Sequence, residues 1–96
     1  MSAYLVFDID IHDRAAYAEY VRLAGPTVAL YGGKVLALSD AVESLEGEWK
    51  PKRVVIIEFD DATKARDWMS SPEYGKAKPI RHRTAGASVV IVPGLK

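Results

Sequence analysis

Two carboxylates, Asp10 and Glu58, occupy matching places in a weak internal repeat and are candidates for acid–base chemistry. Residues 10–13 (Asp-Ile-His-Asp) align with residues 58–61 (Glu-Phe-Asp-Asp). On adjacent parallel strands, spaced about 4.8 Å apart, the two carboxylates would lie within about 5–8 Å. Close carboxylates in a half-apolar cavity drive one pKa upward, as a general acid or base near neutrality requires. The structural alternative is that both are solvated or paired with arginines such as Arg53.

His12 and His82 are the histidines of the chain, and an imidazole can exchange a proton near neutral pH. Neither belongs to a His-x-x-His or Glu-x-x-His pattern, and the chain has no cysteine. We therefore expect no metal and no cofactor. His82 lies in the basic segment 76–83, which is compatible with holding an anionic ligand. The alternative interpretation of this segment is a solvated helix face.

Tyr31 and Trp68 are the aromatic residues that we expect to line a pocket, with Arg53 or His82 as the electrostatic partner. Core packing is the competing interpretation, because aromatic side chains at helical spacing usually anchor a helix to a sheet. Gly-x-Gly-x-x-Gly, phosphate-loop and Gly-x-Ser-x-Gly patterns do not occur in the chain. The candidate ligand site therefore consists of Tyr31, Arg53, Trp68 and His82, beside the two carboxylates.

The hydrophobic pattern divides the chain into the elements that must position these side chains. Alternating β-branched and aromatic residues predict strands, and apolar residues at helical spacing predict helices. The Gly25-Pro26 step predicts a kink in the first helix or its division into two. The predicted strands are 3–11, 34–39, 53–59 and 87–92, with a short hairpin arm at 41–45 and a loop at 46–51; the predicted helices are roughly 14–31, a helix that follows Asp61 and ends at Ser70-Ser71, and a helix from Pro72 to about Arg83.

The order of these elements, β-α-β-β-α-β, predicts an α+β fold of the ferredoxin-like kind, with an antiparallel sheet and one domain over residues 1–96. In this interpretation the first and third strands are parallel neighbours at the centre of the sheet. A chain of 96 residues is too short for a second core.

One face of the predicted sheet has no helices to cover it. Tyr4, Val6, Val54 and Ile56 alternate out of phase with the residues that face the helices, and they share the open face with the carboxylates. An exposed apolar face of that size is a liability for a monomer. We therefore expect a homodimer that forms through the open sheet face.

The amino-acid composition argues against two classes of binding partner, nucleic acids and membranes. The sequence has 13 Lys plus Arg and 13 Asp plus Glu, so its formal net charge is zero, which argues against nucleic-acid binding. No apolar stretch approaches the roughly 18 residues of a membrane span, and the first residues lack the basic start of a signal peptide. We expect a soluble cytoplasmic protein.

Several short motifs resemble those of the uncharacterised family known as domain of unknown function 1330. These are Tyr31-Gly32-Gly33, the Leu-Glu-Gly-Glu-Trp-Lys-Pro segment 45–51, and Ser71-Pro72-Glu73-Tyr74, which follow Trp68. The resemblance covers nearly the whole chain and implies a dimeric α+β barrel, in which two ferredoxin-like units join sheet to sheet. Members of that superfamily include cofactor-free monooxygenases and muconolactone isomerases, whereas the family itself implies no particular reaction.

Two hypotheses on function follow. In the first, a homodimer binds a small apolar or aromatic metabolite in a cavity between sheet and helices. Its chemistry would be cofactor-free oxidation or proton transfer, with Asp10 or Glu58 as the base. In the second, the chain is a non-catalytic binding or assembly module whose sheet face serves only dimerisation.

Overall fold

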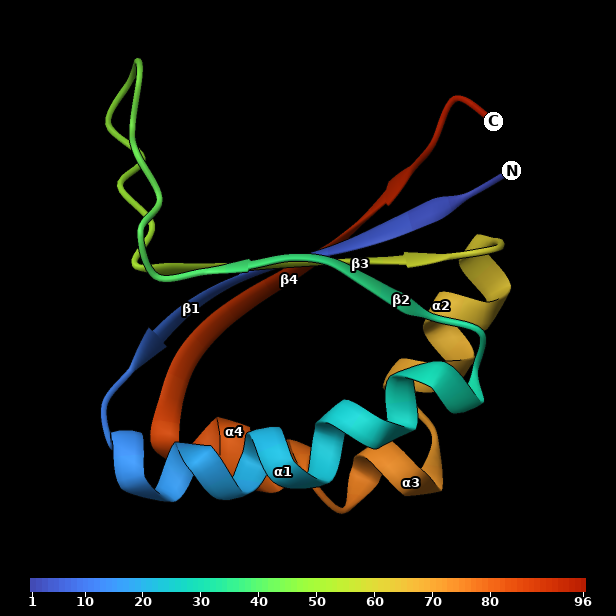
Figure 1. Ribbon diagram of the computed structural model, residues 1–96, viewed down its shortest axis with the longest axis horizontal. Coiled ribbons are helices and arrows are strands. Elements are labelled where there is room, and N and C mark those ends of the chain that lie inside the picture. Colours follow the sequence, from blue (N-terminus) through green and yellow to red (C-terminus); the bar gives the residue numbers. More distant parts are fainter.

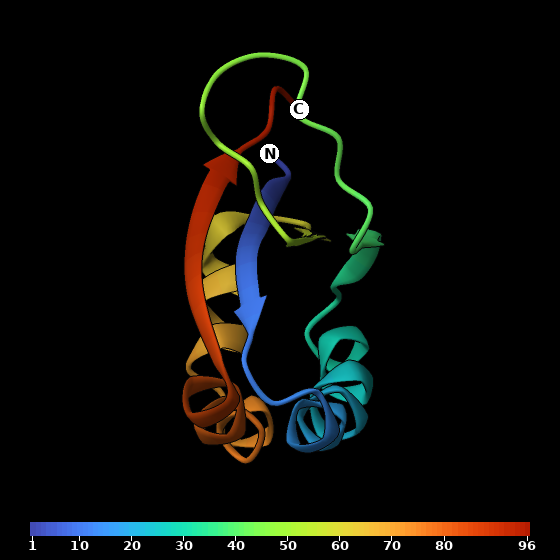
Figure 2. The ribbon, with the colours of Figure 1, turned by 90° about the vertical axis from the view of Figure 1, so that its left-hand side faces the viewer.

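The computed structural model describes all 96 residues and shows a four-stranded sheet with helices packed on one side (Figures 1 and 2). The strands follow the order β2-β3-β1-β4 across the sheet. None of the helices has the length and apolar character needed to cross a membrane. The elements in chain order are β1 (Ala3–Ile11), α1 (Arg14–Leu30), β2 (Lys34–Ser39), β3 (Arg53–Phe59), α2 (Ala62–Met69), α3 (Pro72–Gly75), α4 (Lys78–Thr84) and β4 (Ala85–Pro93).

This order is the ferredoxin-like β-α-β-β-α-β arrangement, as the sequence predicts, with β1 and β3 as the central strands. The predicted parallel pairing of β1 and β3 is wrong, because they run antiparallel, with Tyr4 opposite Glu58 and Asp8 opposite Val54. The connectivity explains the direction. The crossover through α1 makes β2 parallel to β1, and the chain then reverses into β3, which pairs antiparallel with β2.

The core lies between the helices and one face of the sheet. Side chains on this face alternate along β1, where Leu5, Phe7 and Ile9 are buried, and along β3, where Ile57 and Phe59 are buried. The intervening side chains point to the opposite, open face. The period-two pattern of the sequence thus assigns each strand residue to the core or to the open face.

The helices differ from the sequence prediction in two places. The first helix continues through Gly25-Pro26 as one element, so its division into two helices is wrong, and the buried Thr27 and Val28 lie in its last turn, against the core. The predicted helix 72–83 is instead two short helices, α3 and α4. Pro79 has no N–H to continue the hydrogen-bond ladder from the first to the second, which accounts for the break.

Residues 40–52 form no strand, so the predicted hairpin arm at 41–45 is wrong. This segment, which we call the arm, rises from the end of the sheet on the side away from the helices (Figure 1). The indole N–H of Trp49 donates a hydrogen bond to Asp8 Oδ2 at 2.9 Å and so ties the arm to the open face.

The turn that ends α1 depends on two glycines. Gly32 adopts φ +75°, and the N–H groups of Gly32 and Gly33 donate to the carbonyls of Ala29 and Val28 at 3.0 and 2.9 Å. These two bonds form a Schellman motif, which satisfies carbonyls that the helix end leaves free. The chain then passes so close to the core that a Cβ at Gly33 would lie 2.7 Å from both Phe59 Cε1 and Val28 Cγ1.

We predict that Gly33→Ala lowers the free energy of unfolding by about 1–3 kcal/mol, because the added methyl overpacks the contact with Phe59 and Val28. Urea unfolding measures the change. Gly75→Ala is the matched control, since a Cβ there has no neighbour within 4 Å; because Gly75 is helical, this variant should match the wild type or be more stable by up to about 1 kcal/mol. Equal stability of all three proteins would show that the turn is not tightly packed.

Candidate functional site

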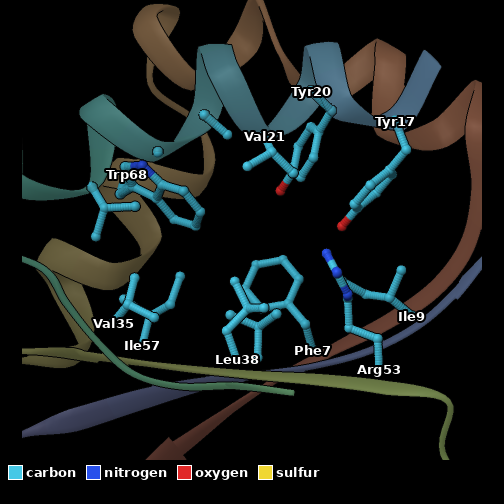
Figure 3. A pocket seen from close by; sticks show the side chains of 14 residues that line it. Phe7, Ile9, Tyr17, Tyr20, Val21, Val35, Leu38, Arg53, Ile57 and Trp68 are labelled. Carbon is cyan, nitrogen blue, oxygen red and sulfur yellow. The ribbon is translucent and has the colours of Figure 1, made fainter. Parts of the chain in front are cut away.

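A pocket opens between α1 and the sheet, next to the edge strand β2 (Figure 3). Its volume is ≈ 80 Å³, whereas a single water requires only about 10–15 Å³ by the same measure. Twelve of its 14 lining residues are hydrophobic, so its binding energy for a ligand would come mainly from apolar burial. The lining residues are Phe7, Ile9, Tyr17, Tyr20, Val21, Ala24, Gly25, Val28, Val35, Leu38, Arg53, Val55, Ile57 and Trp68.

Trp68 forms one wall of the pocket and is 1% exposed. Its ring stacks on Tyr74 with centroids 4.1 Å apart, makes an edge contact with Phe7 at 6.2 Å and lies tilted against Phe59 at 5.8 Å. Its N–H donates to Thr27 Oγ1 at 2.9 Å, which leaves no buried polar atom of the indole without a partner. These contacts fix the indole plane, so this wall is rigid.

Arg53 is the one charged residue that lines the pocket, and its side chain is 15% exposed. Its guanidinium forms a bidentate pair with Asp40, with Nε–Oδ1 at 2.6 Å and Nη2–Oδ2 at 3.1 Å. The hydrogen bond from Arg53 lowers the pKa of Asp40, and Asp40 in turn raises the pKa of Arg53. The guanidinium carbon also lies 5.5 Å from the ring centroid of Tyr17.

Two phenol groups, Tyr17 and Tyr20, point into the pocket from α1 (Figure 3). Burial raises the pKa of both groups, and Tyr74 raises that of Tyr20 further. Arg53 opposes the rise at Tyr17. Both phenols therefore stay protonated at neutral pH and can donate hydrogen bonds.

Behind the pocket wall lies a buried polar cluster. Tyr20 Oη and Tyr74 Oη are 2.9 Å apart, and Arg81 Nε donates to Tyr74 Oη at 3.2 Å. Arg81 is only 4% exposed, so the interpretation of segment 76–83 as a solvated face is wrong at this residue. The guanidinium lies 5.7 Å from the ring centroid of Phe7, which itself lines the pocket.

Only two of the four residues predicted to bind a ligand lie at the pocket. Trp68 and Arg53 line the pocket, whereas Tyr31 and His82 do not. The Tyr31 hydroxyl donates to Glu73 Oε1 at 2.8 Å, and this bond raises the pKa of Tyr31. His82 is exposed beside Arg81, and partial burial together with Arg81 and Lys78 lowers its pKa.

Asp10 and Glu58 do not form a carboxylate pair, so this prediction is wrong. Glu58 lies opposite Tyr4 in the antiparallel register, and Asp10 lies six residues farther along the same strand as Tyr4, or about 20 Å away. Both point to the open face of the sheet, away from the pocket. Asp10 instead lies 3.4 Å from Lys52 Nζ.

His12 Nε2 lies 4.0 Å from Asp10 Oδ2 on the exposed surface. No group of three or more His, Cys, Asp or Glu side chains is close enough to hold a metal ion.

The polar residues that the sequence prediction missed are Tyr17, Tyr20, Tyr74 and Arg81. The spacing of Tyr17 and Tyr20 indicates a helix face that packs on the sheet, but spacing does not reveal a gap in that packing. A buried tyrosine needs a partner for its hydroxyl, and Arg81 follows Tyr74 by seven residues, which is two turns of the single helix predicted over this segment. That spacing is the signal that would have placed the two side chains together.

We predict that the contribution of the Arg53–Asp40 pair to stability disappears in acid. Because the folded-state pKa of Asp40 is lowered, the contribution is complete above the unfolded pKa of about 3.9 and is lost as the pH falls through the folded value. Urea midpoints of the wild type and Asp40→Asn should therefore differ at pH 7 and converge in acid. Glu46→Gln, an arm variant without an ion pair, should match the wild type throughout. A constant offset between wild type and Asp40→Asn would contradict the pairing.

Solved structures with this fold are similar to the chain over almost its whole length. A protein of unknown function from Rhodopseudomonas palustris, RPA0582, is 21% identical with a TM-score of 0.79, over 99% of this chain and 83% of that one. A dimeric ferredoxin-like protein of unknown function from Jannaschia is 9% identical with a TM-score of 0.75, over 98% and 100%. SnoaB, a cofactor-independent oxygenase from Streptomyces nogalater, is 12% identical with a TM-score of 0.68, over 99% and 94%.

At these identities the likeness concerns the fold. No curated protein matches the chain. Residues 2–95 match the family model described as domain of unknown function (DUF1330). The chain therefore belongs to the DUF1330 family.

Proposed function

We propose that the protein is a homodimer that binds a small apolar or aromatic metabolite in the pocket between α1 and the sheet. The observation that carries this proposal is the pocket itself, in which apolar walls enclose a single charged side chain. Ligand sites commonly combine apolar walls with a few convergent polar groups. Phe7, Trp68 and Leu38 supply the apolar walls, and Arg53 and Tyr17 supply the polar end.

The polar end fits an oxygen atom on the ligand. Arg53 is oriented by Asp40, and Tyr17 stays protonated beside it, so both present N–H or O–H donors. The reactions proposed for such a ligand are proton transfer and cofactor-free oxidation by dioxygen. Both begin when the ligand loses a proton to solvent, which leaves negative charge on a carbonyl or phenol oxygen. Fixed N–H and O–H donors stabilise that charge. The fold of SnoaB is compatible with the oxidation, while its 12% identity transfers no residue roles.

Asp10 and Glu58 have no part in this proposed site, because both lie on the open face of the sheet. Asp40 is the carboxylate next to the pocket, through its pair with Arg53. Tyr31 and His82 also lie outside the lining.

The proposed homodimer forms through the open face. Val6 lies opposite Ile56 on one side and Val90 on the other, and Ala37 extends the row beyond Ile56. An apolar row thus crosses all four strands, and Val90 at its end is 54% exposed. Apolar surface of this kind is typical of an interface core. A second copy of the chain covers such a row with its own equivalent row.

A second candidate function is a non-catalytic assembly module. The apolar row on the open face favours it, because dimerisation there needs nothing from the pocket. A protein that forms dimers yet binds no small molecule in the pocket would fit this function and exclude the first.

We predict that Val21→Trp weakens binding of nitrobenzene by at least about tenfold, measured by isothermal titration calorimetry. Val21 lines the pocket and is 43% exposed, so an indole there would occupy the pocket space that supplies the apolar binding energy. Leu30→Trp is the control, since Leu30 is exposed on the same helix outside the pocket. No binding by the wild type, or equal binding by Val21→Trp, would contradict the proposed ligand site.

We predict that Val6→Asp converts the dimer into a folded monomer, measured by sedimentation equilibrium and circular dichroism. The carboxylate would stand between Ile56 and Val90, where a monomer hydrates it and a dimer buries it without a partner. Leu30→Asp introduces a carboxylate at an exposed residue of α1, on the other side of the sheet, and should leave the dimer intact. A monomeric wild type would refute the dimer, and a dimeric Val6→Asp would place the interface elsewhere.

A further inference from the structure

We propose that the hydroxyl of Tyr20 is an oriented hydrogen-bond donor that selects ligands carrying an anionic oxygen on an aromatic or conjugated skeleton, such as phenolates and enolates. The inference rests on the proposed ligand pocket and specifies the chemical class of its ligand. It follows from the hydrogen bonds among three buried side chains, Tyr20, Tyr74 and Arg81.

The three side chains form a chain of hydrogen bonds that ends at the pocket. Arg81 Nε donates to Tyr74 Oη at 3.2 Å, and Tyr74 Oη lies 2.9 Å from Tyr20 Oη. All three residues are buried, with Tyr74 at 0% exposure, Arg81 at 4% and Tyr20 at 7%. Of the three, only Tyr20 lines the pocket.

The guanidinium sets the direction of these bonds. Arginine can only donate, so Tyr74 Oη accepts from Arg81. The hydrogen of Tyr74 then needs an acceptor, and Tyr20 Oη is the one within hydrogen-bond distance. Because a buried hydroxyl rarely leaves its hydrogen unpaired, we assign Tyr74 as the donor to Tyr20.

This assignment leaves the hydrogen of Tyr20 without an acceptor in the protein. Figure 3 shows the Tyr20 oxygen directed into the pocket from α1, above the ring of Phe7. The hydroxyl therefore offers its hydrogen to whatever occupies the pocket. A hydroxyl that already accepts a hydrogen bond is polarised and donates more strongly, which favours an acceptor with negative charge.

Charge balance also favours an anion. Arg53 is neutralised by its bidentate pair with Asp40, whereas no carboxylate lies within 4.0 Å of the buried Arg81. The contacts of the Arg81 guanidinium are the Tyr74 hydroxyl, the ring of Phe7 and, at 3.5 Å, His82 Nε2. A buried charge without a counter-charge is unfavourable. An anionic oxygen beside Tyr20 would provide that counter-charge through the two phenols.

The walls of the pocket define the rest of the ligand. Phe7, Leu38 and Trp68 are apolar and offer flat or branched surfaces to a ring. A compact inorganic anion would leave these walls without contact, and a neutral hydrocarbon would leave the Tyr20 hydrogen unpaired. A phenolate or a conjugated enolate satisfies both ends of the pocket.

The test compares 4-nitrophenol, whose ionisation is visible in its absorption spectrum, with nitrobenzene, which has the same ring and cannot ionise. In the wild-type protein the ionisation midpoint of bound 4-nitrophenol should lie below that of the free compound. Tyr20→Phe should weaken binding of the phenolate by about tenfold or more, because a hydrogen bond to a charged group is lost. The midpoint should return toward the free value, while nitrobenzene affinity changes by no more than about twofold.

Matched variants distinguish the effect of the hydrogen bonds among Arg81, Tyr74 and Tyr20 from a general loss of structure. Tyr74→Phe keeps the donor at Tyr20 but removes its polarising neighbour, so the phenolate affinity should fall by about two- to fivefold. The double variant Tyr20→Phe/Tyr74→Phe leaves no phenol unpaired and should bind the phenolate as weakly as Tyr20→Phe. Tyr31→Phe removes a hydroxyl that bonds Glu73 outside the pocket and should match the wild type.

Two results would overturn the inference on Tyr20 while sparing the pocket. One is a wild-type protein that binds nitrobenzene as tightly as the phenolate. The other is a Tyr20→Phe protein that retains the lowered ionisation midpoint, which would assign the anion preference to Arg53. A wild-type protein that binds neither compound would instead refute the proposed ligand site, and with it this inference.

Discussion

The contacts of Trp68 determine how the helices sit on the sheet. Its ring stacks on Tyr74 and meets Phe7 and Phe59 of the two central strands, while its N–H is bound by Thr27 of the first helix. One rigid side chain thus connects three helical segments to the sheet centre. The same side chain forms one wall of the pocket, which lies between α1 and β2.

The helices all lie on one face of the sheet, so one face is covered and the other is open. The covered face contains the core and the pocket, and the open face presents the apolar row centred on Val6. The proposed ligand site and the proposed dimer interface therefore lie on different faces of the sheet, since no open-face residue lines the pocket. The polar end of the pocket likewise has two parts: Arg53, balanced by Asp40, and Tyr20, connected to a guanidinium that no carboxylate balances.

Much of the fold follows from the sequence pattern, because period-two alternation and capping residues are local properties. The strands 3–11, 34–39 and 53–59 have the predicted bounds, and Asp13 and Asp61 cap the first two helices through their side chains. The direction of β3 was wrongly predicted from the order of the elements, although the chain reversal after β2 already requires β3 to run antiparallel to β1. That error alone placed Asp10 and Glu58 next to each other in the predicted sheet. The candidate site could not be predicted in this way. The gap beside Trp68 and the burial of Arg81 arise from how three helices pack together, which no local sequence pattern specifies.

The most direct measurement is a crystal structure of the protein bound to 4-nitrophenol at a pH where the bound compound is ionised. We predict a complex in which the ring lies between Trp68 and Leu38 in the pocket, with the phenolate oxygen within hydrogen-bond distance of Tyr20 Oη, in each protomer of a dimer joined by its open faces. A ring bound on the open face, or an oxygen directed away from Tyr20, would contradict it.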